Sequence, residues 1–331
     1  MLRSVERPVT PRALRIAAAL LATAVFALAL WVLQRELGGG RVQEVLHLAA
    51  DFSPRRILLA IAFTAVSFLV LTGYDNLSLR YIRRPLPYRQ TALASFLNYA
   101  FSQGLGFPLL TGGSVRLRLY SRWGLTGLEV AQLVAFASFT FWFGVVALTG
   151  LVLLWAPPGI TRILPVTAAA VRPAGLLLLA VVASYFWWTA TGRRVTRLLG
   201  WRFRRPAPRL AALQLGLACV DWTVAGLACW VLMPTDIGIG FPSFMAVFLL
   251  AFVAGIVSHV PAGLGVFESA ILLLLPASAS EVSVLASLLV YRGVYYLLPL
   301  VSATLLLGGH ELWHRVRGEP PAAPHDDPGA S

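Results

Sequence analysis

The stretch at residues 101–124 interrupts an otherwise apolar chain in a way that an ordinary membrane-spanning helix does not permit. Its sequence, FSQGLGFPLLTGGSVRLRLYSRWG, holds glycines and a proline that break a helix, and three arginines follow at once. Irregular backbone at membrane depth is tolerated only where other protein buries it or where it lines a watery cavity. Ionisable residues in such a place indicate a functional site. The pattern is therefore more typical of a transporter than of an anchor.

The composition places nearly the whole chain in a membrane. Of the 331 residues, 58% are hydrophobic and 12% are charged, whereas soluble domains carry about 25% charged residues. The sequence contains no lysine, which a Walker A motif requires, so ATP hydrolysis by that motif is excluded. The arginines lie mainly between the apolar segments, and we interpret them as orientation signals and lipid contacts. We therefore expect no nucleic-acid partner.

Six uninterrupted apolar segments are long enough to cross a membrane. They lie at 13–33, 57–79, 127–155, 174–191, 210–232 and 281–307. Two further segments, 91–124 and 244–276, are interrupted. The first run could instead be a signal peptide, but it is longer than the usual apolar core of one and no clear cleavage site follows. We therefore predict that it is an uncleaved first helix.

Arginine placement orients these segments. The links at 80–89 and 192–209 are rich in arginine, whereas those at 233–243 and 276–280 contain none. By the positive-inside rule the first two links are cytoplasmic and the other two lie outside. A full crossing by 91–124 would invert the following helices against these signals. We therefore predict that both interrupted segments are re-entrant hairpins, which enter a bacterial inner membrane from opposite sides.

The predicted fold class is an all-α polytopic membrane protein with about six transmembrane helices and two opposed, broken, re-entrant hairpins. Residues 13–308 form one membrane domain, in which 13–155 and 174–307 are the halves of an inverted repeat, a common transporter plan. Residues 1–12 are a predicted cytoplasmic N-terminus. Residues 309–331 are a predicted disordered cytoplasmic tail, rich in proline and polar residues.

Glycine and proline define the two predicted breaks. Broken helices need such residues, so a structural role is sufficient to explain them, although they also shape any cavity between the hairpins. The break residues are Gly104, Gly106, Gly112, Gly113, Pro261, Gly263 and Gly265.

Three passages resemble a known family. They are Tyr74-Asp75 with Leu79-Arg80-Tyr81, the run from Asn98 to Tyr120 with its Gly112-Gly113-Ser114-Val115-Arg116, and Pro261-Ala262-Gly263-Leu264-Gly265-Val266-Phe267-Glu268. Over roughly 57–307 the chain resembles the N-terminal membrane domain of the multiple peptide resistance factor, within the lysylphosphatidylglycerol synthase transmembrane-region family. The resemblance implies lipid translocation, with a membrane phospholipid such as aminoacylated phosphatidylglycerol as cargo. It does not extend to the aminoacyl-transferase half, so we expect no synthase activity and no cofactor.

Arg116 and Arg118 follow the Gly112-Gly113 turn. Free amides at a helix N-terminus favour anions, and arginine can grip a phosphate with two hydrogen bonds. We hypothesise that these arginines capture a headgroup phosphate; the alternative is that they reach out to the cytoplasmic headgroups. Because they are two residues apart they point to different faces of a helix, and Arg116 is the stronger candidate.

Glu268 lies just past the second break, in apolar surroundings, with Arg292 as its evident partner. Counted back from the outer turn at about 1.5 Å per residue, both lie some 12–17 Å deep. Two interpretations stay open. The pair could fix the hairpin to a helix, or Glu268 could receive a cationic headgroup or a coupling proton.

Asp221 and His259 are candidates for a proton path. The alternatives are a helix-packing hydrogen bond for Asp221 and a polar break residue at His259. Asp75 and Asn76 lie near the cytoplasmic end of their helix, where we expect contact with headgroups or a loop. No metal site is visible.

Two other classes of function compete with a lipid flippase. An enzyme acting on lipid headgroups would need a nucleophile–base pair or a metal cluster, and the sequence shows neither. The alternatives that remain are a non-catalytic membrane partner of a separate lipid synthase and a transporter of another lipid-linked substrate.

Overall fold

The computed structural model describes residues 39–105, 113–155, 168–191, 195–198, 201–276 and 279–306. The predicted first helix, the N-terminus before it and the C-terminal tail lie outside these residues. In chain order the elements are α2 (Gly39–Ala50), α3 (Pro54–Ile82), α4 (Tyr88–Leu105), α5 (Gly113–Arg122), α6 (Gly127–Trp155), α8 (Ala168–Thr191), β1 (Val195–Leu198), β2 (Trp201–Arg204), α9 (Pro208–Trp230), α10 (Phe241–Val257), a 3₁₀ turn (Pro261–Gly263), α11 (Val266–Leu274), α12 (Glu281–Tyr291) and a π-helical turn (Arg292–Leu297).

Five described helices are long and apolar enough to cross a membrane, which confirms the prediction of a helical polytopic membrane protein. They are Pro54–Ile82, Gly127–Trp155, Ala169–Thr191, Pro208–Trp230 and Glu281–Leu306. Each matches a predicted segment. Three of them begin earlier than predicted, at Pro54, Ala169 and Pro208. At Pro54 and Pro208 the reason is that proline suits the first helical turn, where its missing N–H costs no hydrogen bond.

One short sheet departs from the all-helical prediction. Between α8 and α9, β1 pairs antiparallel with β2, with Val195 opposite Arg204 and Leu198 opposite Trp201. The two strands place valine, threonine and aromatic residues, which favour extended backbone, between arginines. From its arginines, the link at 192–209 was predicted only to be polar and cytoplasmic.

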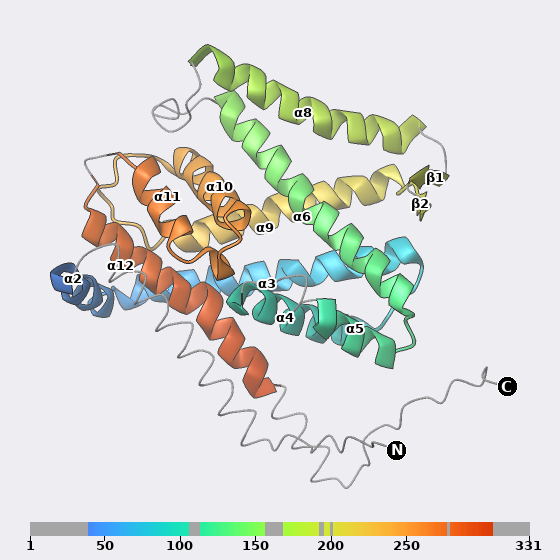
Figure 1. The fold of residues 1–331 in the computed structure, drawn as a ribbon, viewed down its shortest axis with the longest axis horizontal. Helices are drawn as coiled ribbons and strands as arrows, with labels where there is room; N and C mark the ends of the chain where they lie inside the picture. The colour runs from blue at the N-terminus through green and yellow to red at the C-terminus, as the bar shows by residue number, and fades with distance from the viewer. Residues whose placement is uncertain are drawn as a thin grey trace, which may run out of the picture.

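The long helices pack in antiparallel pairs, α3 with α9 and α6 with α8, and α9 also contacts α6 (Figure 1). Small residues allow the close approach, as is usual between membrane helices. A Cβ added to Gly144 of α6 would lie 2.5 Å from the Cβ of Ala218 in α9. One added to Gly175 of α8 would lie 2.8 Å from the backbone nitrogen of Leu154. These contacts place α6 between α9 and α8, and Gly73 of α3, whose added Cβ would lie 2.7 Å from Leu217 Cδ1, places α9 beside α3 as well.

Both interrupted segments are broken helices, as predicted. In the first, α4 contacts α5. In the second, α10 packs along α11, and the backbone between them turns through left-handed conformations at Ala262 and Gly263, with φ of 53° and 59°. A Cβ at Gly263 would lie 3.1 Å from the Cα of Gly255, so the turn also needs glycine for space. The 3₁₀ turn of the second segment contacts α4, so the two broken segments meet.

Each broken segment starts and ends at one end of the bundle. Arg84, just before α4, forms an ion pair of 2.6 Å with Glu129 in the first turn of α6. At the opposite end Arg56, in the first turn of α3, donates to the carbonyls of Val231 and Met233, which follow the end of α9 in the link that leads to α10. α12 begins at that same end, where α2 buries Val45 against its side chains. This is the geometry that a re-entrant hairpin requires.

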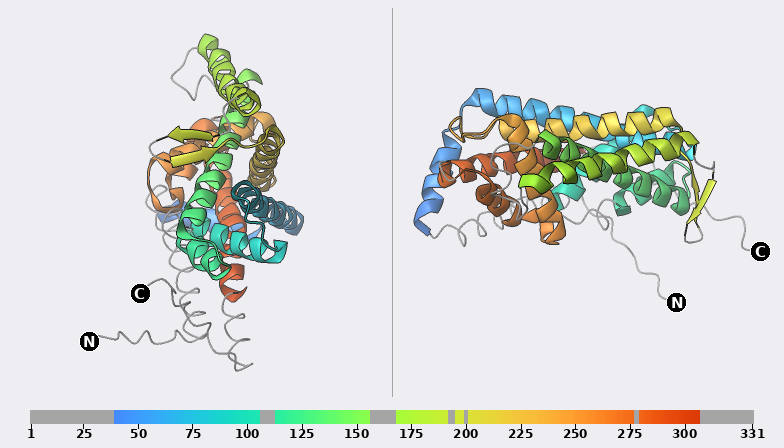
Figure 2. Two further views of the ribbon diagram at one scale, coloured as in Figure 1. Left: turned by 90° about the vertical axis from the view of Figure 1, so that its right-hand side faces the viewer. Right: turned by 90° about the horizontal axis from the view of Figure 1, so that it is seen from above.

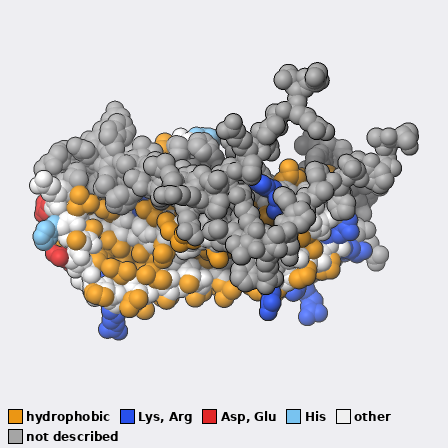
Figure 3. All heavy atoms as spheres, turned by 90° about the horizontal axis from the view of Figure 1, so that it is seen from below, with side chains coloured by type: hydrophobic (Ala, Val, Ile, Leu, Met, Phe, Trp, Pro, Cys, Tyr) orange, Lys and Arg blue, Asp and Glu red, His pale blue; other side chains and the backbone are white. Residues whose placement is uncertain are grey.

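Charge divides between the two ends. Figure 3 shows hydrophobic side chains across the middle of one face, most of its arginines at one end, and acidic and histidine side chains at the other. Figure 2 places α2 at the end opposite β1 and β2. The arginine-rich end is therefore the one where α3 ends and α9 begins, which is the end predicted to be cytoplasmic. The placement of the hairpins in a bilayer and the inverted repeat stay predictions.

Single cysteines test that placement. In a background with Cys219 and Cys229 replaced by alanine, we expect cysteines at Arg89 and Ser121 to react with an impermeant maleimide from the same side of the membrane. A cysteine at Asp236 should react only from the other side. All three positions are exposed. Reaction of the Arg89 and Ser121 positions from opposite sides would exclude a re-entrant first hairpin, and with it the inverted repeat.

Candidate functional site

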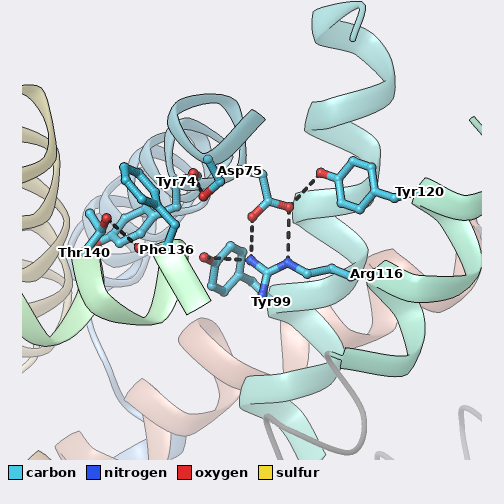
Figure 4. A network of polar contacts seen from close by, with 8 residues as sticks. Tyr74, Asp75, Tyr99, Arg116, Tyr120, Phe136 and Thr140 are labelled. Carbon is cyan, nitrogen blue, oxygen red and sulfur yellow. Dashed lines mark hydrogen bonds and ion pairs between the residues drawn. The ribbon is translucent and has the colours of Figure 1, made fainter. Parts of the chain in front are cut away.

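The first buried ion pair joins the second arm of one hairpin to a spanning helix. Arg116 lies in the first turns of α5, and its Nη2 and Nε donate to the two carboxylate oxygens of Asp75 in α3, at 2.5 and 3.3 Å (Figure 4). The Tyr120 hydroxyl donates to the same carboxylate at 2.8 Å, and Arg116 also donates to the Tyr99 hydroxyl at 3.0 Å. The side chains of Arg116 and Asp75 are 8% and 0% exposed.

This geometry corrects the expectation for Asp75, which contacts neither headgroups nor a loop. It lies on the inner face of α3, where it compensates the charge of Arg116. A buried cation without such a partner would be very costly. Arg118, two residues on, is exposed, as expected from the helical spacing.

The second buried ion pair is the one that the sequence predicts. Arg292 Nε lies 2.7 Å from Glu268 Oε1, with the two side chains 7% and 15% exposed. The same guanidinium donates to the carbonyls of Ala262 at 2.7 Å and Gly263 at 3.4 Å. The other oxygen of Glu268 accepts from the Gly265 amide at 2.9 Å. Arg292 thus holds the break of the second hairpin through both its carboxylate and its backbone.

The two hairpins carry their charges at equivalent places. Arg116 comes three residues after Gly113, where α5 begins, and Glu268 comes three residues after Gly265, which caps α11. Each side chain is paired with an opposite charge on a spanning helix. The polarity is reversed, because the first hairpin supplies the cation and the second supplies the anion.

A third polar cluster lies on α9. Asp221 accepts hydrogen bonds from Ser67 at 2.9 Å and from Tyr74 at 3.0 Å, both on α3. Ser67 in turn lies 2.8 Å from the hydroxyl of Tyr295 in the π-helical turn. Asp221 therefore makes the helix-packing hydrogen bonds that the sequence analysis weighed against a proton path.

The remaining predicted residues are dispersed. His259 is exposed, has φ of 56°, and contacts the Val257 carbonyl through Nδ1 at 2.8 Å; no described contact joins it to Asp221. Gly104 packs beneath Leu300, whose Cδ2 would lie 2.9 Å from an added Cβ. Gly106 and Gly112 lie outside the described residues.

Sequence reasoning missed the polar groups that complete two of the three clusters. They are Asp75, Tyr99 and Tyr120 around Arg116, and Ser67, Tyr74 and Tyr295 around Asp221. The signal was present in Tyr74-Asp75, a polar pair inside an apolar helix, but nothing in the sequence showed which face it occupied. Across the described part of the chain, no three His, Cys, Asp or Glu residues could together hold a metal ion.

The fold and the paired charges define a class: polytopic membrane proteins with two broken helical segments, each fixed to a spanning helix by a buried ion pair. Residues 17–303 match the family described as "Lysylphosphatidylglycerol synthase TM region". The chain belongs to this family.

Relatives of two sizes were found. The chain is 35% identical to uncharacterized protein slr0712 of Synechocystis sp., over 90% of this chain and 92% of that protein. It is 31% identical to inner membrane protein YbhN of Escherichia coli, over 80% and 82%. It is 26% identical to a phosphatidylglycerol lysyltransferase of Staphylococcus aureus, over 86% of this chain but 33% of that protein. The similarity to the lysyltransferase is therefore confined to one part of a larger protein.

Proposed function

We propose that the protein is a lipid translocase that moves a phospholipid, such as aminoacylated phosphatidylglycerol, between the leaflets of a bacterial inner membrane. The observation that carries the proposal is the pair of broken segments, which meet inside the bundle and are each closed by a buried ion pair. Buried charges are costly and mark ion or substrate pathways in membrane proteins.

Partner exchange is the chemistry that this arrangement offers. A phosphate presents the same paired acceptor oxygens as Asp75, so it can take over the two hydrogen bonds of Arg116. A headgroup amine can replace Arg292 at Glu268. A lipid with both groups would open both hairpins, while its acyl chains stayed in the bilayer. The arginine-rich end would face the cytoplasm, with both termini on that side.

The comparison with the lysyltransferase supports a lipid cargo and leaves the aminoacyl transfer to another part of that protein. It also motivates a second candidate, in which the chain is a non-catalytic partner of a separate lipid synthase. The two candidates differ in whether the purified chain moves lipid alone.

Translocation in liposomes tests this. We expect wild-type protein to expose fluorescently labelled inner-leaflet phosphatidylglycerol, or its lysylated form, to a reductant added outside. Arg116→Gln and Glu268→Gln should each slow movement by tenfold or more, because a hydrogen bond to a charged group is worth about 1.5–3 kcal/mol.

Arg122→Ala is the matched control for this assay, because Arg122 is an exposed arginine on the same helix as Arg116. It should move lipid at the wild-type rate. Each variant is checked for an unchanged elution profile before reconstitution. Wild-type protein that moved neither lipid, with or without a proton gradient, would count against the translocase and favour the partner protein.

A further inference from the structure

Asp221 occupies a position between the two ion pairs. Tyr74, which donates a hydrogen bond to Asp221, is next to Asp75 in α3, and Asp75 belongs to the first ion pair. Through Ser67, Asp221 also reaches Tyr295, three residues after Arg292, which holds the second pair. One buried carboxylate is thus connected by short polar contacts to the backbone segments that carry both pairs.

Among the described residues, the groups that contact the carboxylate of Asp221 are hydroxyls and not cations. The residue is 4% exposed, and its two oxygens each accept one hydroxyl, from Ser67 and Tyr74. Within the described residues, no arginine or histidine forms an ion pair with it. A buried carboxylate in this situation is neutralised by taking up a proton or a cation.

The titratable groups facing Asp221 come from three elements. Tyr74 reaches it from α3, and Tyr295 comes from the π-helical turn by way of Ser67. Tyr99 of α4 lies against Tyr74 with ring centroids 6.2 Å apart, and it in turn contacts Arg116. The residue next to Asp221 in α9, Trp222, contacts aromatic rings of α6 and α10, namely Phe141 and Phe252.

A proton on Asp221 would reverse the hydrogen bonds of this chain. With the carboxylate ionised, Ser67 donates to Asp221 and accepts from Tyr295. With the carboxyl protonated on the facing oxygen, Ser67 becomes the acceptor from Asp221, and its own single proton is then free to be donated to Tyr295. The contact between Ser67 and Tyr295 is compatible with either direction.

The reversal would act on an irregular segment of the last spanning helix. Residues Arg292–Leu297 form a π-helical turn inside an otherwise α-helical span, and such turns occur often at functional sites. The turn begins with Arg292, whose guanidinium holds Glu268 and the carbonyls of the second break.

We propose that Asp221 is a proton-binding site and that the proton it binds is the coupling ion for the opening of the second hairpin. This inference rests on the proposed function, because it supplies the ion that drives lipid movement. Proton uptake switches the Ser67–Tyr295 contact, the π-helical turn adjusts, and Arg292 releases the break.

Infrared difference spectroscopy tests the binding site without measuring lipid movement. In vesicles, a protonated-carboxyl band should appear as the pH is lowered and disappear as it is raised. Asp221→Asn should lose the band, whereas Asp236→Asn, an exposed carboxylate, should keep it. A band that does not titrate, or one that responds to Na⁺ and not to pH, would overturn the proposal.

A cysteine at Val257, an exposed residue at the end of α10, tests the coupling. In the background without Cys219 and Cys229, its rate of modification, divided by that of an exposed reference cysteine at Asp236 to remove the ionisation of the thiol itself, should follow the same pH midpoint as the band. Asp221→Asn should make this ratio independent of pH. Tyr295→Phe should keep the infrared band, but the ratio for the cysteine at Val257 should no longer change at the pH at which the band titrates. A ratio in Tyr295→Phe that still follows the titration would overturn the proposed route, whatever the outcome of the lipid assay.

Discussion

Asp75→Ala should lower the stability of the protein by about 3–5 kcal/mol, because it leaves the charge of Arg116 buried without a carboxylate. The reason lies in the burial of both side chains and in the two hydrogen bonds between them. Tyr120 would lose its acceptor at the same time. The measurement is the temperature at which purified protein in detergent loses its monodisperse elution peak.

Two further variants separate a lost pair from general damage to α3. Asp75→Leu combined with Arg116→Met removes both charges and should recover most of the loss, since apolar residues of similar volume can replace a buried pair. Arg122→Ala, on the exposed side of α5, should leave the transition temperature unchanged. A double variant no more stable than Asp75→Ala would show that the cost lies in packing and not in the unpaired cation.

The spanning helices could be predicted because each is a continuous apolar run between polar or proline-containing links. The segment 127–155 was predicted with the bounds that α6 has, since arginine-rich sequence precedes it and proline follows it. The second break was predictable from Pro261 and Gly263, whose backbone an ordinary helix cannot accommodate. The β-hairpin was missed because its arginines gave the signal of a loop.

Only one of the two ion pairs could be found from the sequence, and the difference is geometric. Glu268 and Arg292 flank one short outer turn, so counting back along two antiparallel helices brings them to the same depth. Asp75 and Arg116 are separated by a link and by all of α4, so their meeting depends on how α5 packs against α3. No periodicity within either helix contains that information.

Reversing the charges of the second pair should fail to restore it. Arg292→Glu and Glu268→Arg are each expected to destabilise the protein by at least about 3–5 kcal/mol, since each places like charges together. For a pair held by charge alone, the double reversal would regain most of this loss. Here Arg292 also donates to two carbonyls, which can only accept, and Glu268 accepts from an amide, which can only donate. In the reversed pair a carboxylate would face the two carbonyls and a guanidinium would face the amide, so all three hydrogen bonds would be lost.

The first pair supplies the matched comparison. The neighbours of Asp75 and Arg116 include the hydroxyls of Tyr120 and Tyr99, which can each donate or accept. A reversed Asp75→Arg with Arg116→Asp should therefore recover more of its loss than the reversed second pair. Transition temperatures of the single and double variants give the coupling free energy of each pair. Full recovery by the reversed second pair would mean that the carbonyl contacts contribute little.

The asymmetry bears on how a headgroup could open each hairpin. If an amine takes over Glu268, Arg292 keeps the carbonyls of Ala262 and Gly263, so its charge is not left without acceptors. Arg116 holds the two carboxylate oxygens of Asp75, so an incoming anion of similar shape could take over both of these hydrogen bonds. An amine at Glu268 would therefore remove only part of the contacts that hold the second break, and Arg292 must also release the two carbonyls before that hairpin opens.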